Sequence, residues 1–151
     1  QVYAPTTYEI YHVDVIMNER EISIDLYDTS GQEEYDRIRP LGYPDTDVAL
    51  IAYAIDSPYS LSNITYKLPE IRHFVPEVSV ILVGCKKDLR TDEKTIKELA
   101  STGESAVTYD EGLAFAREIG ATAFVECSSL TDEGIWHALH VVSWLAVYAK
   151  R

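Results

Sequence analysis

Two short runs of consecutive apolar residues most restrict how this chain can fold. They cover residues 48–55 (VALIAYAI) and 80–83 (VILV), and a similar run fits residues 123–127. Runs of this length without polar alternation are typical of parallel strands that helices cover on both faces. We therefore predict a parallel sheet at the centre of the fold.

A different pattern precedes these runs. Apolar residues occupy every second position in 13–17 and again in 22–26, and the polar link Asn18-Glu19-Arg20 joins the two segments. Strict alternation indicates strands with one buried face, and the short link indicates that they run antiparallel. The N-terminal part is thus predicted to be a β-hairpin.

Helical signals lie between the predicted strands. Ser57-Pro58 opens a helix towards Phe74, which Pro69 can interrupt, and Thr108 with Glu111 forms a capping-box pattern for a helix ending at Gly120. Apolar stripes predict two more helices, over 91–102 and from 135 to 146. Alternating strands and helices after a hairpin predict one α/β domain over 1–151, with an open, mostly parallel sheet and an antiparallel hairpin at its edge.

Charge and composition exclude several classes of partner. A net charge of -12 and a pI of about 4.6 argue against nucleic acid or an anionic membrane as a surface partner.

No apolar run is long enough to span a bilayer, and the chain ends at Arg151 without a prenylation box. Cys85 and Cys127, far apart in apolar contexts, indicate reduced thiols of a cytosolic protein. We expect a cytoplasmic protein without a direct membrane anchor, unless a lipidated tail follows Arg151.

Polar groups follow two of the predicted strands. In open α/β sheets, ligands bind at the carboxyl ends of the strands, where Asp28 and residues 85–88 are expected. Asp28 can hold a hydrated Mg²⁺, the Gly31 amide can approach a phosphate, and the Gln32 amide can orient a water. This combination indicates a phosphate-transfer centre.

The same segments carry a family resemblance. Residues 28–35 (DTSGQEEY) resemble the Asp-Thr-Ala-Gly-Gln segment of Ras-like small GTPases, and 35–47 are similar to the Rho/Rac branch. Residues 85–88 (CKKD) resemble the Asn-Lys-x-Asp guanine-specificity motif, and 127–131 (CSSLT) resemble the loop that contacts the base. Residues 3–9 are similar to the first switch loop of Rho-type GTPases, and 89–105 to their characteristic insert. The resemblance extends over essentially the whole chain.

The resemblance implies a site for GTP or GDP with Mg²⁺. Thr6 would ligate Mg²⁺ and sense the γ-phosphate, and Asp28 would hold the metal through a water. Gly31 would bind the nucleotide, and Gln32 would be the catalytic residue that positions the attacking water. The base would be bound by Lys86, Asp88, Ser128 and Ser129. Three segments depart from the family pattern. Cys85 replaces the Asn, Ser30 replaces an Ala that neighbours the glycine, and residues 7–10 are TYEI where the family commonly has Val-Phe-Glu-Asn.

The resemblance also implies protein partners. Rho-type effectors, exchange factors and GTPase-activating proteins would bind a surface formed by Tyr8, Glu9, Tyr35, Arg37, Leu41 and Tyr43. The sequence does not single out one partner among them.

The phosphate-binding loop of the family has not been found in this chain. None of the seven glycines begins a Gly-x-x-x-x-Gly-Lys-Ser/Thr pattern. By the resemblance, this loop and the central strand before it precede the first switch, so we expect an N-terminally incomplete domain with a gap beside the strand ending at Asp28. Three origins stay open for such a chain: a piece of a longer Rho-like GTPase, a short form that rearranges or borrows a strand from a partner, or an independently stable, active enzyme. Two functions stay open: a GTP-hydrolysing switch, or a non-catalytic interaction module that retains the effector surface.

Overall fold

The computed structural model describes residues 8–148, and it begins with the predicted hairpin. Strands β1 (Tyr8–Met17) and β2 (Arg20–Thr29) pair antiparallel, with Val13 opposite Ile24 and Val15 opposite Ile22. Asn18 and Glu19 both have positive φ angles, as the tight turn between right-twisted strands requires. The predicted antiparallel hairpin is confirmed, and the structure adds its register.

A three-stranded parallel sheet forms the centre of the molecule. Its strands are β3 (Val48–Ala54), β4 (Ser79–Cys85) and β5 (Ala123–Glu126), in the spatial order β3-β4-β5. The ends of each strand lie within two residues of the run that predicted it. The central strand β4 is the most deeply buried, as its run of Val, Ile and Leu predicted.

Helices follow each strand of the parallel sheet. They are α1 (Pro58–Ser62), α2 (Ile64–Phe74), α3 (Glu93–Ser101), α4 (Tyr109–Glu118) and α5 (Ile135–Tyr148), with short 3₁₀ turns η1 (Glu33–Tyr35), η2 (Arg39–Gly42) and η3 (Lys87–Thr91). The capping box of Thr108 and Glu111 is present. The interruption predicted at Pro69 is wrong: Pro69 lies inside α2, and the helix breaks earlier, at Asn63. Proline removes only its own N–H, and α2 continues past that single missing donor.

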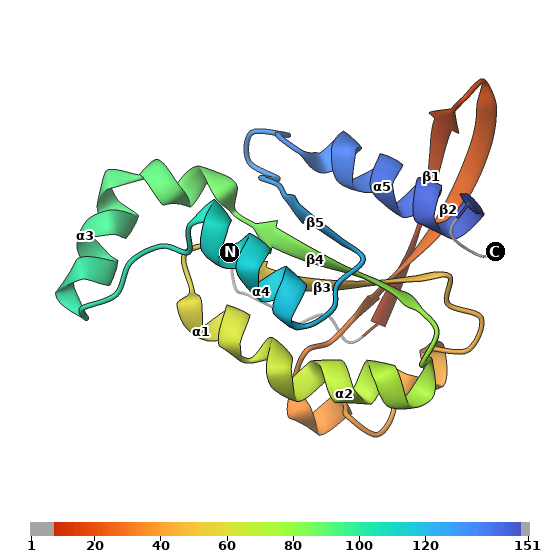
Figure 1. The fold of residues 1–151 in the computed structure, drawn as a ribbon, viewed down its shortest axis with the longest axis horizontal. Coiled ribbons are helices and arrows are strands. Elements are labelled where there is room, and N and C mark those ends of the chain that lie inside the picture. The colour runs from red at the N-terminus through yellow and green to blue at the C-terminus, as the bar shows by residue number, and fades with distance from the viewer. Residues whose placement is uncertain (1–7, 149–151) are drawn as a thin grey trace.

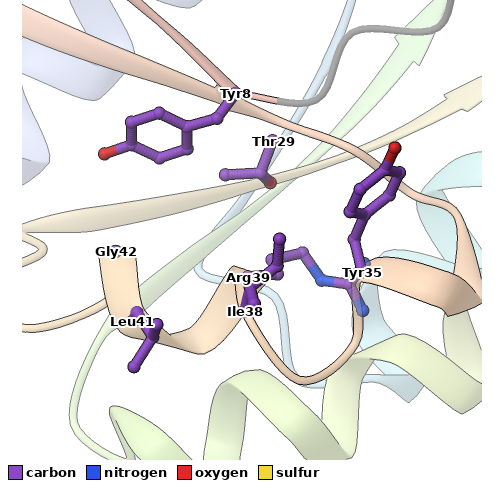
Figure 2. A pocket seen from close by; sticks show the side chains of 7 residues that line it. All are labelled: Tyr8, Thr29, Tyr35, Ile38, Arg39, Leu41 and Gly42. Atoms are coloured by element: carbon purple, nitrogen blue, oxygen red, sulfur yellow. The ribbon is translucent and has the colours of Figure 1, made fainter.

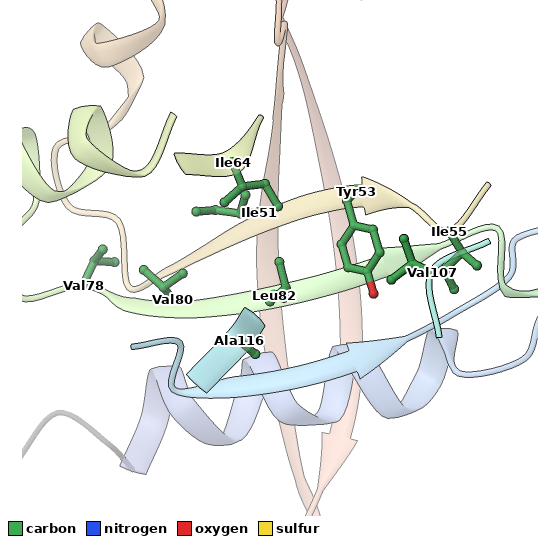
Figure 3. Close-up of a cluster of buried hydrophobic side chains, with 9 residues drawn as sticks. All are labelled: Ile51, Tyr53, Ile55, Ile64, Val78, Val80, Leu82, Val107 and Ala116. Carbon is green, nitrogen blue, oxygen red and sulfur yellow. The ribbon is translucent and has the colours of Figure 1, made fainter. Parts of the chain in front are cut away.

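Helices cover both faces of the parallel sheet (Figure 1). On one face, α2 and α4 enclose a core that contains Tyr53 of β3 and Leu82 of β4, shown in Figure 3. On the other face, α5 contributes Val142 and Leu145 to a second core with Ile81 and Val125. Among the described residues, no helix is both long enough and apolar enough to cross a membrane.

The hairpin is separate from the parallel sheet. In residues 8–148, β1 and β2 form a two-stranded sheet that is not hydrogen-bonded to β3, and the hairpin runs across the direction of β3–β5 (Figures 1 and 3). A groove of about 860 Å³ lies between them, lined by β2, β3, α5 and the end of α2. The α/β class and both kinds of strand pairing are confirmed. Within residues 8–148 the hairpin is not a hydrogen-bonded edge of the parallel sheet, and the groove lies beside β2, the strand that contains Asp28, where the sequence leads us to expect a gap.

Candidate functional site

The two loops expected to bind the base meet at the carboxyl ends of β4 and β5. Lys86 follows β4 in the left-handed region, with φ 59°, so the chain turns sharply into η3 and presents Asp88. Ser128 follows β5, is fully buried and donates a hydrogen bond from its Oγ to Asp88 Oδ1 at 2.5 Å. Of the predicted base-binding residues, the structure thus joins Asp88 and Ser128 directly.

Backbone hydrogen bonds hold these loops in place. The Lys87 N–H donates to the Cys127 carbonyl at 3.0 Å, and the Ser128 N–H donates to the Glu133 carbonyl at 2.8 Å. Lys86 Nζ lies 3.5 Å from Asp56 Oδ1, an acidic partner after β3 that the sequence patterns did not single out. Ser129 is exposed beside this cluster. The result is a carboxylate, a hydroxyl and an ammonium group at one edge of the sheet.

The predicted phosphate-end residues lie where β2 ends. Asp28, Gly31 and Gln32 are all exposed, whereas Ser30 between them is buried. The Ser30 Oγ accepts a hydrogen bond from the Gln32 N–H at 3.2 Å, so the hydroxyl that replaces the family's Ala makes a local turn contact. Within residues 8–148, no hydrogen bond or ion pair joins this group to the base-end cluster.

A buried arginine fixes this loop, and the sequence reasoning did not identify it as a site residue. Arg39 Nη1 donates to the Ser30 carbonyl at 2.7 Å, while its Nε and Nη2 donate to the two carboxylate oxygens of Glu70 on α2 at 3.0 and 2.9 Å. Arg39 also pairs with Asp36. Glu70 is 31 positions away in the chain, so no local spacing pointed to the pair. Arg39 thereby connects the loop that carries Gln32 to α2.

The pKa values of this cluster follow from its contacts. Burial disfavours the Glu70 carboxylate, but hydrogen bonds from Arg39 and Tyr43 outweigh it and lower the pKa of Glu70. Burial, followed by the hydrogen bond to Glu70, raises the pKa of the Tyr43 phenol to about 12. Tyr43 Oη donates to Glu70 Oε1 at 2.6 Å. Tyr43 and Arg39 therefore stabilise the ionised form of Glu70.

Three of the six residues expected to bind effectors line a small hollow. Figure 2 shows this hollow of about 260 Å³, and its seven lining residues include Tyr8, Tyr35 and Leu41. The Leu41 side chain is 77% exposed. Glu9 and Arg37 are also exposed, outside the lining, and the Tyr43 hydroxyl is bonded to Glu70 instead. The hollow therefore brings together three of the six residues predicted for this surface.

The described residues include the base end of the predicted nucleotide site and part of its phosphate end. At the base end, Asp88 fits guanine, because a carboxylate can accept hydrogen bonds from the N1 and N2 groups of that base, and the Lys86 stem can pack on its face. For the phosphates and Mg²⁺, the described part of the predicted set comprises Asp28, Gly31 and Gln32. Thr6, the predicted Mg²⁺ ligand, lies outside the described residues.

One comparison with known proteins identifies the family. The model of the Ras family matches residues 1–145, which is nearly the whole chain and includes the hairpin, the parallel sheet and both groups of predicted site residues. Ras-family proteins bind GTP or GDP with Mg²⁺, interact with regulators and effectors, and act as signalling switches. The chain therefore belongs to the Ras family of small GTPases.

Proposed function

We propose that this chain is a Rho-type guanine-nucleotide-binding signalling module. The observation that carries the proposal is the cluster at the ends of β4 and β5, where the buried Ser128 holds the Asp88 carboxylate at 2.5 Å beside the turn of Lys86. In this proposal, Asp88 reads the guanine, Lys86 packs on it, and Ser128 and Ser129 complete the loop around it. A fixed carboxylate in a hydrogen-bonded loop is the feature that a guanine-selective site needs.

Two features support the Rho type. Residues 35–47 (YDRIRPLGYPDTD) resemble the Rho/Rac second switch, and they contain the Arg39 that connects this segment to α2. The segment 89–105, which resembles the Rho insert, contains α3, and this helix projects away from the sheet in Figure 1 with no buried residue. An exposed helix added at the base end is suited to contacts with a partner.

Base selectivity tests the proposal. Binding of fluorescent GDP and ADP to the 151-residue chain is measured, together with Asp88→Ala and the control Asp110→Asn, an exposed carboxylate at the start of α4. We expect preference for GDP, a loss of at least about tenfold in that preference with Asp88→Ala, and no change with the control. Equal binding of both nucleotides, or no binding at all, contradicts the proposal.

Hydrolysis is a separate question. We expect no appreciable GTP turnover from these 151 residues, because they contain no Gly-x-x-x-x-Gly-Lys-Ser/Thr, the motif whose amides and lysine hold the phosphates. Phosphate release is measured with and without Mg²⁺ for the unmodified chain and for Gln32→Leu. Turnover that requires Mg²⁺ and disappears in Gln32→Leu contradicts this expectation and assigns Gln32 the catalytic role.

The second candidate function is a non-catalytic interaction module, and the hollow in Figure 2 favours it. Tyr8, Tyr35, Ile38 and Leu41 present apolar surface around this hollow without needing a nucleotide. Binding to the catalytic domain of a Rho-type exchange factor is measured for Leu41→Asp and for Ile16→Asp, since Ile16 is equally exposed, at 74%, on the hairpin. Loss of binding with Leu41→Asp alone supports the module, and loss with both variants, or with neither, contradicts it.

A further inference from the structure

The two cysteines of the chain, 42 positions apart in sequence, are neighbours in the fold. In the β4–β5 ladder, Gly84 is paired with Glu126, and the Cys127 N–H continues the ladder by donating to the Gly84 carbonyl at 2.8 Å. Cys85 and Cys127 are therefore the next pair in register. Residues in register on adjacent parallel strands point to the same face of the sheet.

The packing confirms this shared orientation. Cys127 belongs to the core beneath α5, together with Val83 and Val125, and Cys85 packs against the same core. Both thiols are free. Neighbouring strands lie about 4.8 Å apart, within the range of roughly 4.4–6.8 Å between Cα atoms that disulfides span. The backbone thus places the two sulfur atoms where a disulfide needs little movement.

We propose that Cys85 and Cys127 are an oxidation site that closes to an intramolecular disulfide, linking the two base-end loops of the molecule. Cys85 immediately precedes Lys86, and Cys127 immediately precedes Ser128. A covalent bond between them ties together the starts of both loops. This inference does not depend on nucleotide binding, because it concerns only the two thiols and the ladder that holds them.

Hydrogen peroxide supplies a balanced route. The Cys85 thiolate attacks a peroxide oxygen, which gives a sulfenic acid on Cys85 and releases hydroxide that is protonated to water. The Cys127 sulfur then attacks the sulfenic sulfur, the S–S bond forms, and the hydroxyl group leaves as a second water. Two thiols and one peroxide give one disulfide and two waters, and peroxide takes up both electrons. Cys85 reacts first because it is half-buried, whereas Cys127 is only 8% exposed.

The surroundings of Cys85 set the speed of this reaction. Burial, followed by the adjacent Cys127 thiol, raises the pKa of Cys85 to about 11, while the Lys86 ammonium acts in the opposite direction. Cys85 in turn helps, after burial and Glu126, to raise the pKa of the Tyr53 phenol, so Tyr53 is an electrostatic neighbour of this thiol. Because the thiolate is the reactive form, oxidation is slow near neutral pH and accelerates by about tenfold for each pH unit between 7 and 9.

The test is peptide mapping of the oxidised chain. The reduced 151-residue protein is treated with hydrogen peroxide, alkylated and digested with trypsin without reductant, and the peptides 73–86 and 118–150 carry the two cysteines. We expect one species in which these peptides are joined, monomeric on a non-reducing gel and separated by dithiothreitol. Disulfide-linked dimers, or oxidation of Cys85 to its sulfinic acid while Cys127 keeps a free thiol, overturn the proposal.

Two controls distinguish native adjacency from chance pairing. The same oxidation in denaturant removes the ladder, and we expect the internal cross-link to form at least about tenfold more slowly relative to competing peroxide oxidation. In Cys85→Ser, checked for folding by circular dichroism, we expect the buried Cys127 to stay reduced. A cross-link that forms equally well in denaturant overturns the proposal even if the serine variant does not fold. Hydrogen exchange of 86–90 and 128–134 should be slower in the oxidised protein, and unchanged exchange overturns the proposed link between the loops.

Discussion

The β1–β2 hairpin and the β3–β5 sheet both contain many apolar residues but bury them very differently. In the described hairpin, Val15 is the one apolar side chain in the buried core, and Tyr11, Ile16 and Tyr27 are about half exposed or more. In the parallel sheet, all of Val80, Ile81, Leu82 and Val83 are buried, because helices cover both faces. The groove of about 860 Å³ separates the two regions.

This difference indicates where the stability resides. Apolar burial is the main favourable term in folding, so the parallel sheet with its helices supplies most of the stability of the fold. The hairpin depends on cross-strand pairs and on its contact with α5. Segments with few buried apolar contacts open more easily than the core does. The predicted phosphate-end and effector residues lie on or next to the less buried region, and the base-end cluster lies on the more buried one.

The largest expected effect comes from the centre of the parallel sheet. Leu82→Ala removes a side chain with 0% exposure from the core in Figure 3, and we expect a loss of about 3 kcal/mol in the free energy of unfolding. The matched hairpin variant Ile16→Ala removes a side chain that is 74% exposed, and we expect a change within about 0.5 kcal/mol. Urea unfolding measures both. Equal losses would show that the hairpin is as tightly integrated as the sheet.

A pair of glycine variants sharpens the same comparison. A Cβ at Gly112 of α4 would lie 2.4 Å from Tyr53 Oη and 2.7 Å from Phe124 Cζ, so Gly112→Ala should cost about 2 kcal/mol through overpacking. A Cβ at Gly31 would meet nothing within 4 Å, so Gly31→Ala should leave stability nearly unchanged. The midpoints of thermal unfolding report both. A stable Gly112→Ala protein would mean that α4 can shift away from β3 and β5.

A third variant breaks the connection between the loop after the hairpin and α2. Glu70→Gln removes the charge that holds Arg39, and we expect a loss of about 1–2 kcal/mol together with faster hydrogen exchange at residues 30–36. Glu34→Gln, an exposed carboxylate in η1, is the matched control and should change neither. Loss of stability without faster exchange would show that Arg39 does not position the loop that carries Gln32.

The same pair predicts a pH dependence. The pKa of Glu70 is lower in the folded chain than its ordinary value of 4.5, so its contribution is present above that value and is lost as the pH falls through the folded pKa. The stability difference between the unmodified chain and Glu70→Gln should therefore be largest above pH 4.5 and shrink below it. A difference that stays constant down to acidic pH would exclude the Glu70 charge as its source.

The smallest effect is expected on the hairpin surface. His12 Nδ1 lies 2.6 Å from Asp25 Oδ1, but the two side chains are 79% and 54% exposed. Exposed pairs contribute little, because water screens them and their side chains lose entropy on pairing. His12→Ala should change the free energy of unfolding by less than about 0.5 kcal/mol, as chemical denaturation can show. A larger loss would mean that this cross-strand pair holds the hairpin together.

The sequence by itself determined the elements and the family motifs. Local patterns predicted the hairpin, the three parallel strands and the capping box of α4, because the side-chain spacing of strands and the capping motif of a helix are local properties. It also placed Asp88 and Ser128 at strand ends, where the structure joins them. The helix break was not predicted correctly, since a proline signal does not show how a helix continues around one missing hydrogen bond.

The tertiary structure alone decided which distant residues meet. The pairing of Arg39 with Glu70 and the neighbouring positions of Cys85 and Cys127 both involve segments far apart in the chain. Local patterns carry no information about strand order or about which helix packs over which loop. Those contacts depend on how apolar faces are buried together, and only the folded arrangement of the whole chain determines that.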